Sequence, residues 1–465
     1  MPNNSPGSND VTFFVTTDLH FGKETFASDS RAKHVAMMNT FGNSGTPWPT
    51  SYSFTGTRLG SGAFAGANIP ISAPRGVVTT GDITHYGQTP ELGSFRAYYE
   101  MGNQFPGSIQ FPVYVGLGNH DVDGTCSQPI GPSSCAERMF KYVEERMKGC
   151  GGVSDFDTGS RSYAWDWGQV HLVQLHKWAG DTIFGGASDN NNNPPARHPD
   201  GLQWLANNLR NSVGTTGRPV VLFQHYGWDP FSLGQLNGSP WWSSADQTRF
   251  LDIIKDYNVV AIFSGHGHFG TSGLYEVPVT DSNGNRKTIW NFSGTTGGEG
   301  ADSKAADPTA NPEGSFFAVH ITPSFMDVSQ WEWNSTSAVL VQKQNGANCS
   351  RMVAGADVTS SVKFTWDGFR FDSKTGLFLQ SVGILNTGTA PIKGPLSLVV
   401  DALSSNGTLV NATGKTDCAT SAKPYVEITV PGDVLAPGQS TSGTLKFKNT
   451  GTQSILYVAR IFGTF

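Results

Sequence analysis

The sequence predicts two domains: an α/β layered domain over residues 11–335 and an all-β sandwich over residues 361–465. In the first span, short apolar strand patterns alternate with segments of helical periodicity, which indicates a layered β-sandwich core flanked by helices. In the second span we find no helical pattern, only short alternating strands between turn clusters. Residues 1–10 are expected to be disordered, and residues 336–360 to form a linker.

Composition and charge argue against nucleic-acid binding through a basic surface and against a transmembrane helix. The chain has 465 residues, of which 37% are hydrophobic and 15% charged, and its net charge is −6 without long single-sign blocks. No basic surface suited to nucleic acid is evident. No apolar run approaches the roughly 20 residues of a transmembrane helix.

The elements of the first domain follow from its periodicity, and residues 42–74, rich in Gly, Ser and Pro, are expected to be an excursion from the core. Apolar runs predict strands, and apolar side chains at helical spacing, such as Leu92, Phe95 and Tyr99, predict helices. Two strand-like runs, Tyr163–Trp167 and Val170–Leu175, flank Gly168 and predict a hairpin. The expected strands are 11–17, 76–80, 113–115, 162–168, 169–175, 219–223 and 259–263, and the expected helices are 90–102, 136–148, 201–211 and 245–257.

The second domain is expected to be an immunoglobulin-like sandwich, because seven or so short strands fall within about 110 residues. Six of these strands are expected at 362–365, 377–385, 396–402, 425–430, 442–447 and 455–462. Aromatic residues of this domain (Trp366, Phe369, Phe371 and Phe378) show no pattern that separates a binding face from a core.

Five cysteines predict two disulfides and one leftover thiol. One disulfide is expected within the insertion that holds Cys126, Cys135 and Cys150, with the pairing left open, and the other is Cys349–Cys418. The insertion would then be a disulfide-braced lid after residue 121. No Cys-x-x-Cys spacing points to a zinc–thiolate site. The polar N-terminus has no apolar signal core, so either the protein is not exported or its signal peptide has been removed; we favour a secreted or periplasmic protein.

Polar side chains follow the predicted strands, at the points where a parallel sheet presents reactive groups. These residues are Asp18, His20, Asp82, Asn119, His120, His225, His266 and His268. Carboxylate, imidazole and amide ligands suit Mn, Fe, Zn or similar divalent ions. The set is too large for one tetrahedral ion and about sufficient for two. Two neighbouring ions can stabilise both the attacking and the leaving oxygen of an in-line displacement at phosphorus. Asp82, on an interior strand, is the natural bridge.

These motifs resemble the calcineurin-like metallophosphoesterase family over about residues 11–330. The matching blocks, in order, are Asp18-Leu19-His20, Gly81-Asp82, Gly118-Asn119-His120-Asp121, His225 and Gly265-His266-Gly267-His268. The resemblance implies a metallophosphoesterase-like fold and two divalent metal ions as cofactors. The first ion would be held by Asp18, His20, Asp82 and His268, and the second by Asp82, Asn119, His225 and His266. His120 would protonate or stabilise the leaving oxygen, Asp121 would orient its other nitrogen, and a hydroxide on the metals would attack.

Two features depart from or extend the family pattern. In the purple acid phosphatase branch, a Gly stands where this chain has His20, and a Tyr ligand stands where it has His85. His85 is therefore an extra ligand, a substrate contact or only part of a loop.

The aromatic residues after His225, beginning with Trp228, form either a wall of the substrate pocket or the small core of their own loop. His171, in the middle of a hairpin strand, is expected to be structural. His176 ends the same strand and either points towards the site or is structural, and the structural role is favoured.

The sequence favours a phosphodiesterase. No Arg or Lys lies inside the five motifs to neutralise a phosphomonoester dianion, and Asp-x-His followed by Gly-Asp-Ile-Thr looks more like diesterase members of the family. The expected substrate is a nucleotide, a glycerophosphodiester or a phospholipid headgroup. The alternatives are a phosphomonoesterase of the acid or alkaline phosphatase kind, and a surface-binding protein whose C-terminal sandwich contacts glycans or a cell surface.

Overall fold

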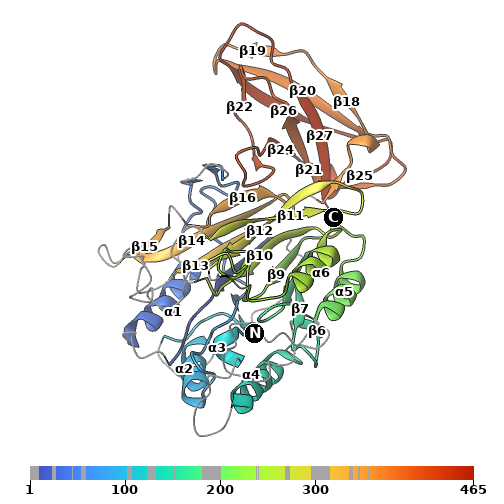
Figure 1. Ribbon diagram of the computed structural model, residues 1–465. Coiled ribbons are helices and arrows are strands. Elements are labelled where there is room, and N and C mark those ends of the chain that lie inside the picture. Colours follow the sequence, from blue (N-terminus) through green and yellow to red (C-terminus); the bar gives the residue numbers. More distant parts are fainter. Residues whose placement is uncertain are drawn as a thin grey trace.

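The computed structural model describes residues 10–22, 28–43, 45–53, 59–101, 107–122, 132–150, 152–180, 201–236, 238, 240–267, 273–294, 315–334, 339–343, 346–353 and 355–464. Figure 1 shows two bodies: a larger one that carries the helices, and above it a smaller one made of strands. We call them the N-terminal and C-terminal domains.

Two seven-stranded sheets form the N-terminal domain. The first has the order β15-β14-β13-β1-β4-β5, with β16 also paired to β14. Its strands are β1 (Val11–Thr16), β4 (Val77–Thr79), β5 (Val113–Tyr114), β13 (Ser315–Ile321), β14 (Phe325–Asn334), β15 (Val339–Gln342) and β16 (Cys349–Met352). In this sheet β1, β4 and β5 run parallel, so their carboxyl ends meet at one edge.

The second sheet has the order β11-β12-β10-β9-β8-β7-β6. Its strands are β6 (Val153–Phe156), β7 (Tyr163–Trp167), β8 (Val170–Gln174), β9 (Val220–Phe223), β10 (Val259–Ser264), β11 (Leu274–Thr280) and β12 (Arg286–Ser293). The interior strands β8, β9 and β10 are parallel. A two-stranded pair, β2 (Ser51–Tyr52) with β3 (Gly62–Ala63), lies outside both sheets.

The two sheets pack face to face through aromatic side chains. Phe13 of β1 contacts Phe223 and Phe263 of the second sheet, with ring centroids 6.1 and 6.3 Å apart. The next residue, Phe14, points the other way and packs on Phe41 of α1. Because strands covered on both faces bury every side chain, they read as continuous apolar runs, which is the pattern that predicted them.

Helices cover the outer faces of the sandwich, α1 and α2 on one side and α5 and α6 on the other (Figure 1). The helices are α1 (Ser28–Asn43), α2 (Thr89–Tyr99), α3 (Asn119–Val122), α4 (Pro132–Met147), α5 (Gly201–Ser212) and α6 (Ser244–Ile254). Four of them were predicted, and the layered fold is confirmed. Helix α1 was not predicted. None of the helices in the described part of the chain is long and apolar enough to cross a membrane.

The C-terminal domain is a sandwich of two antiparallel sheets, in the orders β17-β27-β21-β24-β23 and β18-β20-β26-β22. Its strands are β17 (Ala356–Asp357), β18 (Val362–Trp366), β19 (Arg370–Asp372), β20 (Leu377–Asn386), β21 (Ile392–Asp401), β22 (Gly407–Leu409), β23 (Gly414–Lys415), β24 (Pro424–Ile428), β25 (Val434–Leu435), β26 (Ser440–Asn449) and β27 (Val458–Thr464). Side chains of both sheets, among them Ile384, Leu398 and Phe447, form its core.

The span 336–360, which was expected to be a linker, contains strands of both domains. Strands β15 and β16 pair with β14 of the first sheet, whereas β17 pairs with β27 of the sandwich. We therefore propose a domain boundary between residues 353 and 356. The predicted disulfide Cys349–Cys418 is present and joins β16 to the segment after β23.

A buried histidine of α1, His34, is expected to make stability depend on pH. His34 accepts a hydrogen bond from the Tyr99 hydroxyl (2.7 Å) and donates one to the Ser315 carbonyl oxygen (3.3 Å). Burial lowers the pKa of His34 to about 4. The unfolded chain, with an ordinary histidine pKa, binds a proton at a pH where the folded chain does not, so acid favours unfolding.

Between pH 7 and pH 5, His34 is expected to remove about 2 kcal/mol from the free energy of unfolding. Urea unfolding followed by tryptophan fluorescence should show that the loss of unfolding free energy between pH 7 and pH 5 is about 2 kcal/mol smaller in His34→Gln than in the wild type. Equal losses in the two proteins would contradict the assignment.

Candidate metal centre

The polar residues predicted at the strand ends lie together at one edge of the sandwich. Asp18 and His20 follow β1, and Asp82 follows β4. Asn119 and His120 begin α3, shortly after β5 ends. His225 follows β9 and His266 follows β10, so both sheets contribute. His268 lies outside the described residues.

The main chain at these strand ends takes a conformation that side chains other than glycine rarely adopt. Asp18, His20, Asp82 and His266 have φ values of 53°, 42°, 49° and 69°. Each such residue costs of order 1–3 kcal/mol and persists only where the surroundings enforce it. Strain concentrated on four of the candidate ligands indicates that side-chain direction here is maintained at the expense of stability.

The motif glycines allow the ligand loops to approach one another closely. A Cβ on Gly118 would overlap Asp82 Oδ1 and lie 2.8 Å from its Cγ. A Cβ on Gly265 would overlap Thr17 Oγ1 and lie 2.6 Å from Asp18 Oδ2. Glycine at these positions thus permits the carboxylates to occupy the centre.

The ligand atoms form two clusters that share one carboxylate. Asp18, His20 and Asp82 form the first, and Asp82, His225 and His266 the second; within each, the ligand atoms lie within 4.8 Å of one another. The Asp82 Oδ2 atom lies 3.7 Å from Nε2 of His20 and 3.1 Å from Nε2 of His225. Asp82 therefore lies where a bridging ligand would.

The two carboxylate oxygens of Asp82 have different surroundings. Oδ1 accepts a hydrogen bond from the main-chain N–H of His120 (2.8 Å). Oδ2 is buried and accepts no well-aligned hydrogen bond from the described residues, although Nε2 of His225 lies 3.1 Å away. Although burial opposes the charged form, His225, His120 and His20 hold the pKa of Asp82 well below its usual range. A buried anionic oxygen among imidazole nitrogens is the kind of site that a cation stabilises.

Hydrogen bonds fix the ring orientation of two histidines. His225 donates from Nδ1 to the Thr80 carbonyl oxygen (3.0 Å), and its Nε2 lies 3.0 Å from Asn119 Oδ1. His120 donates from Nδ1 to the carbonyl oxygen of His85 (3.0 Å). Metal-binding histidines are usually held in this way by a bond from the second nitrogen. The donor set and its surroundings fit divalent metal ions.

Asp121 has a different contact from the one predicted. The second nitrogen of His120 bonds to the main chain of His85, so the proposed Asp121–imidazole bond is absent from this geometry. Instead, the buried Asp121 carboxylate accepts from the main-chain N–H groups of Ile83, Thr84 and Gly118. Burial, reinforced by the charge of Asp82, raises the pKa of Asp121 to about 7. Asp121 thus ties two ligand loops together.

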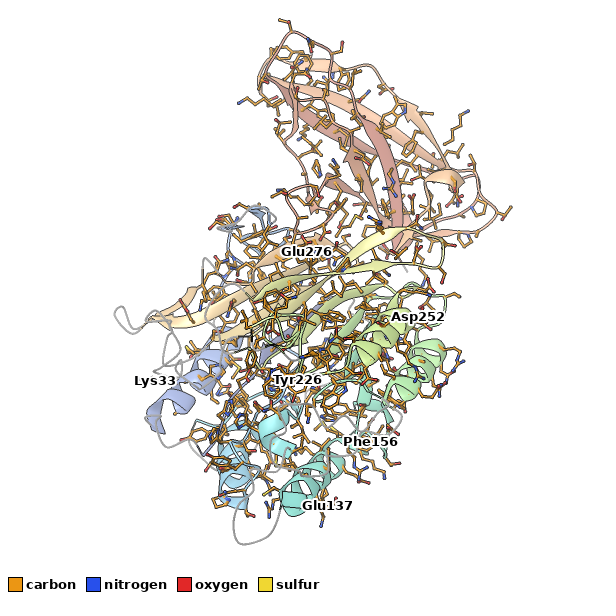
Figure 2. All side chains as sticks on the ribbon, in the orientation of Figure 1. Lys33, Glu137, Phe156, Tyr226, Asp252 and Glu276 are labelled. Carbon is orange, nitrogen blue, oxygen red and sulfur yellow. A yellow bond between two sulfur atoms is a disulfide. The ribbon has the colours of Figure 1, made fainter. Side chains whose placement is uncertain are left out.

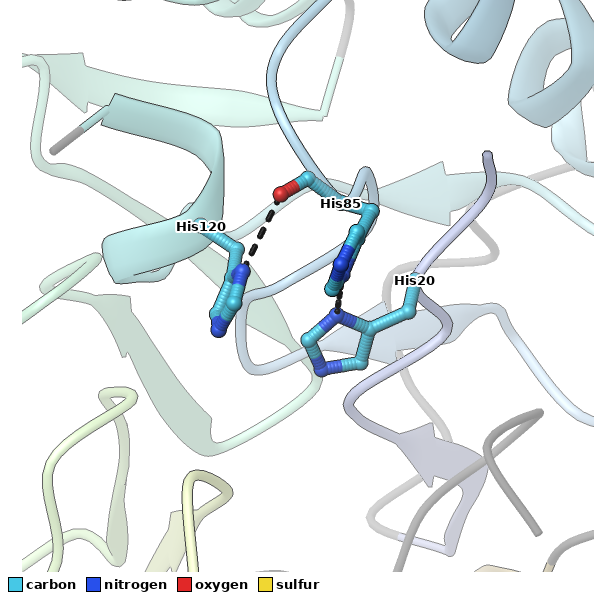
Figure 3. Close-up of side chains that lie close together, drawn as sticks. All are labelled: His20, His85 and His120. Atoms are coloured by element: carbon cyan, nitrogen blue, oxygen red, sulfur yellow. Dashed lines mark hydrogen bonds between the residues drawn. The ribbon is translucent and has the colours of Figure 1, made fainter. Parts of the chain in front are cut away.

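His85 lies inside the site. Its Nδ1 is 3.0 Å from Nδ1 of His20, and its ring stacks on that of His120, with centroids 4.9 Å apart and planes at 16°. Figure 3 shows the three rings side by side. The ligand atoms of these three histidines also lie within 4.8 Å of one another.

The aromatic residues after His225 divide into two groups. Phe231 and Trp241 pack against the ring of His266, with centroids 4.9 and 4.3 Å away. Trp228 packs instead on Trp242 and on Phe250 of α6. Tyr226 also contacts His266 and lies inside the domain, whereas Glu137 and Asp252 project from the surface (Figure 2). The part of the loop near the candidate metal ligands is thus Phe231 and Trp241, and Trp228 faces α6.

Part of the predicted lid lies outside the described residues, including Asp123 and Cys126. Within the described part, Cys135 is disulfide-bonded and Cys150 carries a free thiol.

His176 supports the site without being a candidate ligand. Its Nδ1 accepts from the Leu117 N–H (3.2 Å), and its Nε2 donates to the Arg161 carbonyl oxygen (2.7 Å). Its own carbonyl oxygen accepts from the N–H of His225 (2.7 Å). Burial lowers the pKa of His176 to about 4, so the ring is neutral and can make both bonds. The sequence favoured a structural role for His176, but its partners could not be predicted because both are main-chain groups.

Replacing His176 by Leu should leave the Leu117 N–H and the Arg161 carbonyl oxygen without partners, at about 1–3 kcal/mol each. Urea unfolding should therefore show a less stable protein. His176→Gln, which keeps a donor and an acceptor, should recover at least half of the loss. Equal stability of His176→Leu and the wild type would contradict this role.

One family model and several solved structures are similar to this chain. A family model described as calcineurin-like phosphoesterase matches residues 11–270. Vacuolar Protein Sorting 29 from Cryptosporidium parvum is similar in structure, with 12% identity, 74% of this chain and 99% of that chain covered, and a TM-score of 0.28. A Vps29 double mutant from Entamoeba histolytica is also similar, with 12% identity, 71% of this chain and 98% of that chain covered, and a TM-score of 0.24. No curated protein matches. Since the family model spans more than half of the chain, this protein belongs to the calcineurin-like phosphoesterase family.

Proposed function

We propose that the protein hydrolyses phosphoesters with the help of two divalent metal ions, such as Mn, Fe or Zn, that share Asp82. The observation that supports this most is the position of Asp82 Oδ2 between Nε2 of His20 and Nε2 of His225. The first ion would be held by Asp18, His20, Asp82 and His268, and the second by Asp82, Asn119, His225 and His266.

The bound ions would polarise the phosphoryl group and lower the pKa of a water molecule towards neutrality. The protein positions the leaving group. Because the Nδ1–H of His120 bonds to the carbonyl oxygen of His85, the proton that the ring can give to the leaving oxygen is the one on Nε2, which is present when the ring is doubly protonated. Asn119 offers a neutral oxygen 3.0 Å from His225 and so limits negative charge near an anionic substrate.

We favour a phosphodiester as the substrate: a nucleotide, a glycerophosphodiester or a phospholipid headgroup. A diester carries one negative charge, which suits motifs that contain imidazoles but no Lys or Arg. The Phe231 and Trp241 rings beside His266 would offer an apolar surface to the group esterified to phosphate. A phosphomonoesterase is the alternative.

Hydrolysis of bis(p-nitrophenyl) phosphate and of p-nitrophenyl phosphate, each with Mn²⁺ and with EDTA, tests this proposal. We expect faster turnover of the diester, abolished by EDTA and restored by Mn²⁺. Faster metal-dependent turnover of the monoester would agree with the proposed metal centre but would contradict the diesterase proposal. Turnover of neither substrate with any divalent ion would contradict the hydrolase proposal.

We further propose that the protein is secreted or periplasmic and that its C-terminal domain is immunoglobulin-like. The Cys349–Cys418 disulfide is typical of oxidising compartments. A second function, glycan or cell-surface binding, is favoured by exposed aromatic rings on the sandwich: Trp366 is 42% and Phe371 57% exposed. Sedimentation with insoluble cell-wall polysaccharide should then be lost in the Trp366→Ser, Phe371→Ser double variant, and equal sedimentation would exclude it.

A further inference from the structure

We infer that His85 is a positioning residue for the metal ligand His20. Its Nδ1 accepts the hydrogen bond that keeps Nε2 of His20 unprotonated and directed at Asp18 and Asp82. This inference rests on the proposed function, because it concerns how one ligand of the first ion is prepared.

The two ring nitrogens of His20 face different groups. Nε2 lies 3.9 Å from Asp18 Oδ1 and 3.7 Å from Asp82 Oδ2, on the side where the first ion would bind. Nδ1 points the opposite way and lies 3.0 Å from Nδ1 of His85. At that distance one nitrogen donates and the other accepts. A ligating Nε2 needs its lone pair, so the proton of His20 is on Nδ1 and His85 accepts it.

This arrangement differs from that of two neighbouring histidines. His225 donates its Nδ1–H to the Thr80 carbonyl oxygen, and His120 donates its Nδ1–H to the His85 carbonyl oxygen. Both acceptors are main-chain oxygens, which no substitution removes. Of these three hydrogen bonds, the one made by His20 goes to a side chain. The contribution of the acceptor can therefore be measured at His20 by changing a single residue.

A main-chain hydrogen bond and two ring contacts hold His85 in position beside His20. The main-chain N–H of His85 donates to the Phe21 carbonyl oxygen (2.9 Å), which continues the pairing between the β1 and β4 loops. On one side it stacks on His120, and its ring centroid lies 4.2 Å from that of Tyr86. An acceptor fixed by packing can orient His20 before any ion arrives, which reduces the cost of binding. Figure 3 shows the three rings grouped together, and the His20 and His120 rings also contact each other, with centroids 4.6 Å apart.

The same geometry decides against His85 as a ligand through Nδ1, because that nitrogen already faces Nδ1 of His20 rather than the carboxylates. Two substitutions separate the roles. Asn places its Oδ1 near the position of the histidine Nδ1 and still accepts a hydrogen bond, whereas Leu fills similar space and cannot accept one.

The experiment compares wild type, His85→Asn and His85→Leu by calorimetric titration with Zn²⁺, and by long-range ¹H–¹⁵N spectra of the histidine rings in the zinc-loaded proteins. His171→Asn serves as a control for loss of a histidine outside the site, since His171 bonds to Asp166 and Asn208. We expect Leu to weaken one of two Zn²⁺ affinities by about 10–100-fold. Asn should stay within about threefold of the wild type and keep the Nδ1–H form of His20, and His171→Asn should change neither affinity.

Equal weakening by Asn and Leu would overturn the inference and make the His85 ring itself a ligand. Unchanged affinities in both variants would overturn it in favour of a loop residue without a role in metal binding. A wild-type protein that binds no Zn²⁺ would instead contradict the proposed function on which the inference rests.

Discussion

Replacing Asp82 by Asn is expected to lower diester turnover by about 10³-fold or more, a larger loss than we expect from any other single substitution in the site. Two ions on a substrate supply several kcal/mol of transition-state stabilisation, and about 1.36 kcal/mol corresponds to a factor of ten. Asp82 belongs to both ligand clusters, so its loss weakens both ions together. The shape of the side chain is retained, and the change therefore removes charge rather than volume. Metal content and kcat/KM, measured on the same preparation of Asp82→Asn, would check the expected loss of both ions and of turnover.

Asp166→Asn provides the matched control. Asp166 also bonds to a histidine, with 2.8 Å between its Oδ1 and Nδ1 of His171, but it sits on β7 at the hairpin turn. We expect this variant to retain two ions and at least half of the wild-type kcat/KM. If Asp82→Asn kept its metal and its turnover, Asp82 would not be the shared ligand.

Gly118→Ala is expected to reduce turnover by about 10²-fold or more, since a displacement of about 1 Å at a reacting group can cost that much. The new methyl group would occupy the space of Asp82 Oδ1 and must displace either the carboxylate or the loop that carries Asn119 and His120. The protein should still fold, because the site is at the edge of the sandwich and the core contacts are unchanged. Circular dichroism and kcat/KM together would separate misfolding from displacement.

Gly93→Ala is the control for Gly118→Ala. Gly93 lies inside α2, is exposed, and a Cβ there meets no atom within 4 Å. Alanine should leave kcat/KM unchanged and raise stability by up to about 1 kcal/mol through its helix propensity. Wild-type turnover in Gly118→Ala would show that the close approach to Asp82 is not needed.

The strands and most helices were predictable because burial on both faces leaves a strong pattern in the sequence. The ligand positions were predictable for a related reason: carboxyl ends of parallel strands meet at one edge, so polar residues after several strands converge. Helix α1 was missed because Ser, Asp, Lys and Asn interrupt its apolar spacing, although Val35, Met38 and Phe41 are fully buried. In that helix tertiary packing outweighs the weak local signal.

The connections within the site were less predictable. The partner of His120 is the main-chain oxygen of His85, and main-chain acceptors leave no mark in a sequence. The same is true of Asp121, whose acceptor oxygens bind main-chain N–H groups, and of His176. The positive φ angles at Asp18 and Asp82 could not be read from the sequence, because even Asp, which is enriched in this conformation, adopts it at few positions. Motifs therefore identified which residues meet, and the structure identified how each is held.

The most direct test of the shared-carboxylate centre is a crystal structure of the Mn²⁺-loaded protein with anomalous diffraction. We predict two anomalous peaks per chain: one among Asp18, His20 and Asp82, the other among Asp82, Asn119, His225 and His266, with Asp82 contacting both. A single peak, or two peaks of which neither contacts Asp82, would contradict this account.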